Sequence, residues 1–373
     1  MVNIHEEWDP SLITIDNDTV TDAWKVCIID GVFQSENEYN GSLGARISSI
    51  FVIFFISTFL TLFPLFAQRV PRLRIPLYVY LFARYFGVGV IVATAFIHLM
   101  DPAYDTLGGR TCVGRTGNWG LYSWVPAIIL VSIFAVFLLD VIMQVIVERK
   151  FGIYHDHTAG NQEIETAIIR NQTSTINNVD VENTSESSIR KEQELTATKH
   201  YMSEAEIEHA WRQEFGAFLL LEFGIIFHSV LIGLNLGAVG DEFKTLYIVL
   251  VFHQSFEGLG IGARLSAIPW PASKPTWIPW ACCITYGFVT PVSIAIGLGV
   301  RTTYMSESYN ANIVQGILNA ISSGLLIYNG LVELLARDFI FDHNRTKDLG
   351  KLTFNLGCVI LGGGIMALIG KWA

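Results

Sequence analysis

The sequence predicts an all-α membrane protein whose chain crosses the lipid bilayer eight times. Two observations carry this prediction. Of the 373 residues, 51% are hydrophobic and only 16% are charged, whereas a soluble domain usually carries about a quarter charged residues. In addition, eight stretches are long enough to span, since a helix needs about 20 mostly apolar residues to cross the hydrocarbon layer.

The eight stretches divide the chain into four regions. Residues 1–43 form an acidic tail, 44–147 hold the first three spans, 148–214 form a polar loop, and 215–373 hold the last five spans. The predicted spans are Gly44–Phe66, Leu77–Leu99, Ser123–Val147, Phe215–Val239, Phe243–Leu265, Thr276–Val300, Asn312–Arg337 and Leu352–Trp372. Because their number is even, both termini lie on one side of the membrane.

The distribution of Lys and Arg predicts which side that is. The segments that follow the first, third, fifth and seventh spans carry more than twice as many Lys and Arg residues as the opposite side. Positively charged segments stay in the cytosol, so both termini are expected to be extracellular. The acidic tail, in which Lys25 is the single basic residue, would then raise the local cation concentration outside. A solvated tail without a function explains it equally well.

Cysteine and histidine outside the spans give two further expectations. Cys27 and Cys112 would share the oxidising side and form a disulfide. The five cysteines show no CxxC spacing, so neither a thiolate zinc cluster nor a redox pair is indicated. The 148–214 loop is expected to be cytosolic and disordered. Its His155 and His157 would hold a divalent ion weakly, although such a short motif in a flexible loop is more often incidental.

Polar residues in the middle of the fourth and fifth spans predict a metal site. Burying an ionisable side chain in lipid costs at least about 2.5 to 3.5 kcal/mol, so such residues are functional candidates by default. His253 and Glu257 lie one helical turn apart on one face, and Gln254 flanks that face. On the fourth span His228 lies at the centre, with Ser229 beside it. Neutral imidazole, carboxylate and amide oxygen suit a first-row divalent cation rather than Cu⁺ or Mg²⁺.

The packing around this site can also be predicted. Asn235 lies two turns from His228 on the same face, so it is expected to be a successive station rather than a ligand of the same ion. The pairs Gly233 with Gly237 and Gly258 with Gly262 allow close helix approach, and are expected to bring spans four and five together. A single buried histidine would be explained by a hydrogen bond between helices, but central histidines on two adjacent spans favour a metal site.

Other polar residues in the spans have simpler explanations. His98 and Asp101, at the outer end of the second span, are candidates for an ion entrance, although Asp101 before Pro102 also suits a helix terminus. Glu222 is a candidate exit ligand on the inner side of His228. Arg84 and Asp140 are expected at the same depth in antiparallel spans, and therefore to form a structural ion pair. Glu333 and Arg337 have the spacing of a helix-stabilising pair.

The two central motifs resemble a known signature. His228-Ser229-x-x-Ile232-Gly233, followed by His253-Gln254-x-x-Glu257-Gly258, closely resembles the signature of the ZIP (Zrt/Irt-like protein) divalent metal transporters of the plant and fungal branch. Residues 39–41 and 44–50 look like the start of the first span in fungal plasma-membrane zinc transporters. The resemblance implies eight helices, in which spans one, four, five and six form a transport bundle that moves against a scaffold bundle of two, three, seven and eight.

The resemblance also implies a ligand set and an activity. In the family, the metal binds the equivalents of His228, His253, Gln254 and Glu257. Many members carry a carboxylate that bridges a second ion where this chain has Ile232, so a single ion is expected. The implied function is Zn²⁺ uptake across the plasma membrane, with zinc as the transported substrate and no cofactor. The alternative within transport is iron(II) or a broad range of divalent ions.

Other classes of protein fit less well. The chain has no HExxH motif and nothing that resembles a nucleophile, which argues against an intramembrane metallohydrolase, so no enzyme is expected. A purely sensory receptor would not need ligands in the middle of neighbouring spans. The basic residues form no patch that suits a phosphate backbone, so nucleic acid is excluded. The expected partners are the metal ion and the bilayer, and a homodimer is left open.

Overall fold

The computed structural model of this chain describes Lys25, Cys27, Val32, Tyr39 and residues 41–69, 76–151, 204–240, 243–301, 308–341 and 348–371. Within these residues, eight helical segments are long and apolar enough to cross a membrane. The predicted fold class, an all-α protein with eight spans, is confirmed. The elements that build the spans are α3 (Leu43–Arg69), α4 (Leu77–Ala93), η2 (Thr94–Met100), α5 (Asp101–Leu107), α7 (Trp124–Phe151), α10 (Glu204–Ala238), α11 (Phe243–Ala267), α12 (Ile278–Val300), α13 (Tyr309–Tyr328), η4 (Asn329–Phe341) and α14 (Leu349–Ile369).

The second span is longer than predicted. It continues without a break from α4 through the π-helix η2 into α5, and reaches Leu107 instead of Leu99. At 1.5 Å per residue, this extension moves the end of the span by about 12 Å. The seventh span likewise joins α13 to the π-helix η4 and ends at Phe341. In addition, α10 begins at Glu204, so the last part of the expected loop is helical.

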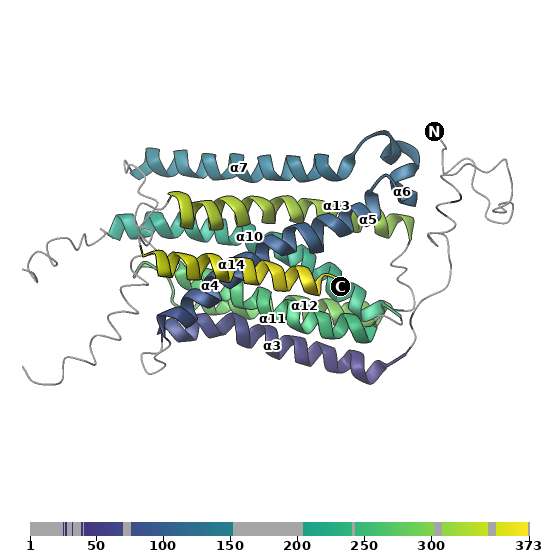
Figure 1. The fold of residues 1–373 in the computed structure, drawn as a ribbon, viewed down its shortest axis with the longest axis horizontal. Coiled ribbons are helices and arrows are strands. Elements are labelled where there is room, and N and C mark those ends of the chain that lie inside the picture. The colour runs from purple at the N-terminus through teal and green to yellow at the C-terminus, as the bar shows by residue number, and fades with distance from the viewer. Residues whose placement is uncertain are drawn as a thin grey trace, which may run out of the picture.

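The helices form two groups of four. In the first, α3 packs against α11 and α12, and α12 packs against α10. In the second, α4 packs along α14, and α13 packs along α7. Contacts of α4 with α11 and of α13 with α10 join the groups. A Cβ atom on Gly87 of α4 would lie 2.2 Å from the Cα of Gly260 of α11, so the two backbones are in direct contact there. Figure 1 shows α7 and α3 at opposite edges of the bundle.

The exposed surface of the bundle is apolar, as a lipid-facing surface must be. Val131 of α7 is 67% exposed and Ile360 of α14 is 74% exposed. Polar side chains such as Thr61, Ser323 and Asn355 are buried instead. A helix satisfies its backbone hydrogen bonds internally, so only its side chains need to match the surrounding lipid. This explains why these apolar stretches fold into helices with their polar faces turned inward.

The bundle has two distinct ends. A short helix, α6 (Cys112–Arg115), and a 3-10 helix, η3 (Gly117–Leu121), connect α5 to α7 at one of them. We call it the disulfide end, because Cys112 is bonded there to Cys27. The chain alternates direction, so α3 begins and α14 ends at the disulfide end (Figure 1). The opposite end carries the start of α10.

The structure assigns the small residues to different partners from those predicted. Added Cβ atoms on Gly233 and Gly237 of α10 would strike α12 at Ser293 and Gly297. Those on Gly258 and Gly262 of α11 would strike Thr61 of α3. The glycine pairs therefore tighten α10 against α12 and α11 against α3. The predicted contact between α10 and α11 is present, but the glycine pairs do not make it. Spacing along one helix marks a close-approach face but does not say which helix fills it.

One predicted ion pair is also wrong. Arg84 donates to Oδ2 of Asp338 at 2.7 Å, and Asp140 accepts a hydrogen bond from the Tyr328 hydroxyl at 2.9 Å. Matching depth in the membrane did not identify the partner, since α4 packs along α14 while α7 packs along α13. The predicted pair of Glu333 with Arg337 is confirmed at 3.2 Å.

Candidate metal site

His253 and Glu257 of α11 lie close together on one face, as the helical spacing predicts. Nε2 of His253 lies 3.7 Å from Oε2 of Glu257. Both side chains are almost completely buried, at 2% and 0% exposed. Because they are one turn apart on one face, an imidazole and a carboxylate are presented together to the space between the helices.

Two further imidazoles converge on His253 from other helices. The ring of His228 on α10 lies 5.3 Å from that of His253, centre to centre. The ring of His98, on η2, lies 4.9 Å from the ring of His253, centre to centre, in an edge-to-face orientation. All three rings are buried. Helices from both groups therefore contribute to one cluster.

The position of His98 corrects the expectation that it lies at the outer end of its span. The second span continues eight residues beyond the predicted end, so His98 lies well inside it. It also belongs to a π-helical turn, a feature that is frequent at functional sites. Its companion candidate Asp101 is exposed at the start of α5 and does not join the cluster.

A hydrogen-bonded chain supports the cluster from α12. Nε2 of Gln254 donates to the Tyr286 hydroxyl at 3.0 Å and to Oγ1 of Thr290 at 2.9 Å. The Tyr286 hydroxyl in turn donates to Oε2 of Glu257 at 3.1 Å. These bonds hold the carboxylate and the amide in place, and they occupy Nε2 of Gln254, which leaves the carbonyl oxygen as the atom this side chain would offer to a cation.

Several polar atoms in the cluster are buried and without a hydrogen-bond partner among the described residues. They are Nε2 of His98, His228 and His253 and Oε1 of Glu257, and Oγ of Ser229, the residue after His228, is a further unpaired buried atom. A buried polar atom left unpaired costs about 1 to 3 kcal/mol. A group of such atoms in one cluster therefore favours a ligand that would pair with them. In the described part of the chain, no three His, Cys, Asp or Glu side chains already have the arrangement of a closed metal site. The candidate ligands surround His253, but the described residues do not form a closed coordination sphere.

The remaining candidates lie in different places. Asn235 is exposed, and the structure does not bring it to the cluster. Glu222 is buried on α10, six residues before His228 and nearer the opposite end. His155 and His157 lie outside the described residues. Cys27 and Cys112 are joined in a disulfide.

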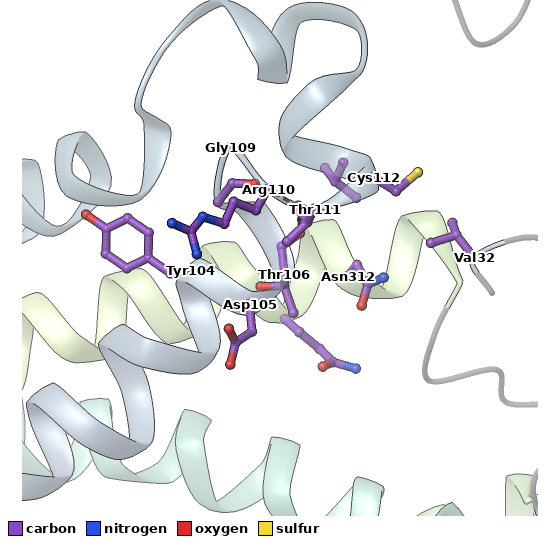
Figure 2. Close-up of a pocket in the computed structure, with 12 residues that line it drawn as sticks. Val32, Tyr104, Asp105, Thr106, Gly109, Arg110, Thr111, Cys112 and Asn312 are labelled. Carbon is purple, nitrogen blue, oxygen red and sulfur yellow. Dashed lines mark hydrogen bonds between the residues drawn. The ribbon is translucent and has the colours of Figure 1, made fainter. Parts of the chain in front are cut away.

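A separate hollow of about 750 Å³ opens at the disulfide end (Figure 2). Neither His98 nor Asp101 lines it, but Asp105, one turn after Asp101, does. Its lining comes from α5, α6, the turn between them and α13, together with Val32. None of the residues that line the hollow is a histidine, so the hollow is distinct from the imidazole cluster.

The sequence interpretation missed Tyr286 and Thr290. Both lie on α12, four residues apart, and therefore on one face. A tyrosine and a threonine at this spacing in an otherwise apolar span were a usable signal. Their role became visible only when α12 was packed beside α11, since a hydroxyl alone in a span is commonly satisfied by its own backbone.

Comparison with known proteins gives a consistent picture. A sequence model of the family described as "ZIP Zinc transporter" matches residues 43–370. Zinc-regulated transporter 1 of Saccharomyces cerevisiae is 59% identical over 99% of this chain and 98% of its own length. Zinc-regulated transporter 1 of Schizosaccharomyces pombe is 39% identical over 90% of this chain and 88% of its own. Zinc-regulated transporter 2 of S. cerevisiae is 34% identical over 91% and 97%. With the eight spans and the two histidine motifs, these matches establish that the chain belongs to the ZIP zinc transporter family.

Proposed function

We propose that this protein carries zinc(II) across the plasma membrane into the cytosol, through the imidazole cluster in the middle of the bundle. One observation carries the proposal. Five buried donor atoms of His98, His228, Ser229, His253 and Glu257 have no hydrogen-bond partner among the described residues. A divalent cation between them would satisfy the imidazoles and the carboxylate at once.

The donor set suits zinc. Imidazole nitrogen and carboxylate oxygen are ordinary zinc ligands, and zinc ranks above iron(II) and manganese(II) in intrinsic affinity for such sites. We propose His228, His253, Glu257 and the carbonyl oxygen of Gln254 as ligands, with His98 as a further imidazole. Iron(II) uptake remains the alternative, but the curated relatives described above are named for zinc.

The position of the ligands between two helix groups supports alternating access. His228, His253 and Glu257 belong to α10 and α11, while His98 belongs to the span that packs along α14. If the first group moves against the second, the ion must leave His98 while the other ligands travel with it. Such a motion exposes a site near the middle of the membrane first to one side and then to the other.

We propose that the disulfide end faces outward. The Cys27–Cys112 disulfide requires an oxidising compartment, and the segments at the opposite end carry the excess of Lys and Arg. Two charges that move through 100 mV release about 4.6 kcal/mol, which is roughly three decades of concentration. Inward movement therefore needs no coupling ion. The apolar faces of α7 and α14 would contact lipid, or a second copy in a homodimer.

Zinc flux into proteoliposomes, with a defined voltage and no pH gradient, tests the proposal. The purified protein should carry zinc inward, faster as the interior becomes more negative. Glu257→Gln should abolish this flux while Glu204→Gln, a change at an exposed position on α10, leaves it unchanged. Wild-type flux in Glu257→Gln would remove the cluster from the mechanism. Competition by iron(II) and manganese(II) against radiolabelled zinc measures the selectivity.

A further inference from the structure

Glu222 carries a buried carboxyl group for which the described part of the chain provides no partner. Its residue is 6% exposed on α10, and it forms no hydrogen bond or ion pair with any residue that the structure describes. Its neighbours Phe218, Leu221 and Ile225 belong to the apolar core. Burial of an unpaired acidic group in such surroundings costs free energy. The imidazole cluster does not explain why an acidic residue is retained at this position.

The packing of α10 against α12 shows what Glu222 faces. Gly233 meets Ser293, and Gly237 meets Gly297, so contacting residues differ by 60 in number and the two helices run in the same direction. The same difference of 60 pairs Glu222 of α10 with Cys282 of α12. Eleven residues make about three turns of helix, with only about 20° of rotation. The two faces that meet at Gly233 and Ser293 therefore also carry Glu222 and Cys282.

Electrostatics agree with this register. The Glu222 carboxylate lies near enough to the thiols of Cys282 and Cys283 for an electrostatic interaction with both. The two thiols differ in their surroundings, however. Cys283 is fully buried, and its Sγ donates to the Thr61 carbonyl oxygen at 3.7 Å, so it ties α12 to α3. Cys282 is free and only partly buried, and no hydrogen bond joins its thiol to another of the described residues.

Cys282 also continues the polar face of α12 that supports the imidazole cluster. It precedes Tyr286 by four residues and Thr290 by eight, and residues at these spacings share a helix face. Cys282 lies about 6 Å from Tyr286 along the helix axis, towards the opposite end of the bundle. A cation that leaves Glu257 in this direction would meet Cys282 and Glu222 next.

We propose that Glu222 and Cys282 form a second metal station on the inner side of the cluster. A thiolate and a carboxylate together suit a borderline or soft divalent cation such as Zn²⁺ or Cd²⁺, and do not suit Mg²⁺ or Ca²⁺. When the cation binds, a metal–sulfur bond forms and the thiol proton passes to water. Two protein ligands hold an ion weakly, which suits a station from which it must depart. Only the direction of travel rests on the proposed function.

Cadmium binding to the purified full-length protein tests the station directly. A cadmium–thiolate bond has its own ultraviolet charge-transfer absorption, which imidazole and carboxylate ligands do not produce. Titration with Cd²⁺ should develop this band in the wild type. Cys282→Ser should remove it, and Glu222→Gln should weaken the affinity it reports by roughly tenfold or more, since even supporting partners of a ligand contribute about 10- to 100-fold. Cys283→Ser and Cys358→Ser, which change the other free thiols, should retain it.

Glu257→Gln separates this proposal from the transport proposal. The band should persist in that variant, because its sulfur ligand lies outside the cluster, even though zinc flux is lost. Absence of the band in the wild type, its retention in Cys282→Ser, or unchanged affinity in Glu222→Gln would each overturn the inner station while leaving the cluster untouched. Loss of the band in Glu257→Gln would also overturn it, by showing that the thiol does not bind independently.

Discussion

The Tyr286 hydroxyl donates a 3.1 Å hydrogen bond to Oε2 of Glu257, and so links α12 to the acidic ligand of α11. The same hydroxyl accepts the Gln254 amide at 3.0 Å. Tyr286 therefore orients two candidate ligands without being one itself. Its ring is fully buried, so removal of the oxygen alone would leave the packing in place.

Tyr286→Phe should raise the KM for zinc several-fold while the protein folds normally. A hydrogen bond is worth about 0.5 to 1.5 kcal/mol net, which corresponds to roughly a two- to tenfold change. Zinc uptake over a concentration series measures it. Tyr328→Phe is the matched control, because it removes a hydroxyl that binds Asp140 away from the cluster. An unchanged KM in Tyr286→Phe would show that the bond does not orient Glu257.

His98→Ala should weaken zinc binding by at least about tenfold if the imidazole is a ligand, since even supporting partners of a ligand contribute about 10- to 100-fold, with surface abundance unchanged. Gly370→Ala offers a gentler test at a position that does not itself bind metal. A Cβ atom on Gly370 would lie 2.5 Å from Cγ2 of Ile97 and 3.3 to 3.4 Å from the His98 ring, so Ile97 must move and the ring must shift by a small amount. We expect a smaller rise in KM in Gly370→Ala, and none in Gly364→Ala, where a Cβ meets nothing within 4 Å. Equal KM values in His98→Ala and the wild type would exclude this ligand.

The buried pair of Arg84 and Asp338 should dominate the stability of the second helix group. Removal of one partner from a buried ion pair costs about 3 to 5 kcal/mol, since it leaves an uncompensated charge. Arg84→Gln and Asp338→Asn should each sharply reduce the yield of monodisperse protein in detergent. The double variant should recover part of the loss. Asp140→Asn, at the partner wrongly expected from the sequence, should not rescue Arg84→Gln.

Arg46 should hold the disulfide end of α10. It is fully buried, and its Nη1 donates to the carbonyl oxygens of Leu236 and Gly237 at 3.2 and 3.1 Å. These carbonyls end a helix and lack partners within it, and the guanidinium also complements the negative end of the helix dipole. Arg46→Lys cannot reproduce the planar fork, so the melting temperature in detergent should fall by several degrees. Arg110→Lys, at an exposed position, should melt like the wild type.

The sequence by itself determined the spans and the relations within each helix. Composition identified eight crossings, and a period of 3.6 residues put His253 and Glu257 on one face and paired Glu333 with Arg337. These features depend on neighbours a turn away, so they can be read from one helix at a time. The length of the second span was underestimated because its final turns carry Asp101 and Asp105, which interrupt the apolar pattern.

Only the tertiary structure decided which helix faces meet. Three features depend on how the eight helices are arranged side by side: the partner of Arg84, the helices tightened by the glycine pairs, and the entry of His98 into the cluster. Many arrangements bury the same apolar faces at similar free energy, and the choice among them comes from the fit of many side chains at once. A pattern within one helix carries no information about that fit. For this reason the sequence predicted candidate ligands on separate helices but not how they lie relative to one another.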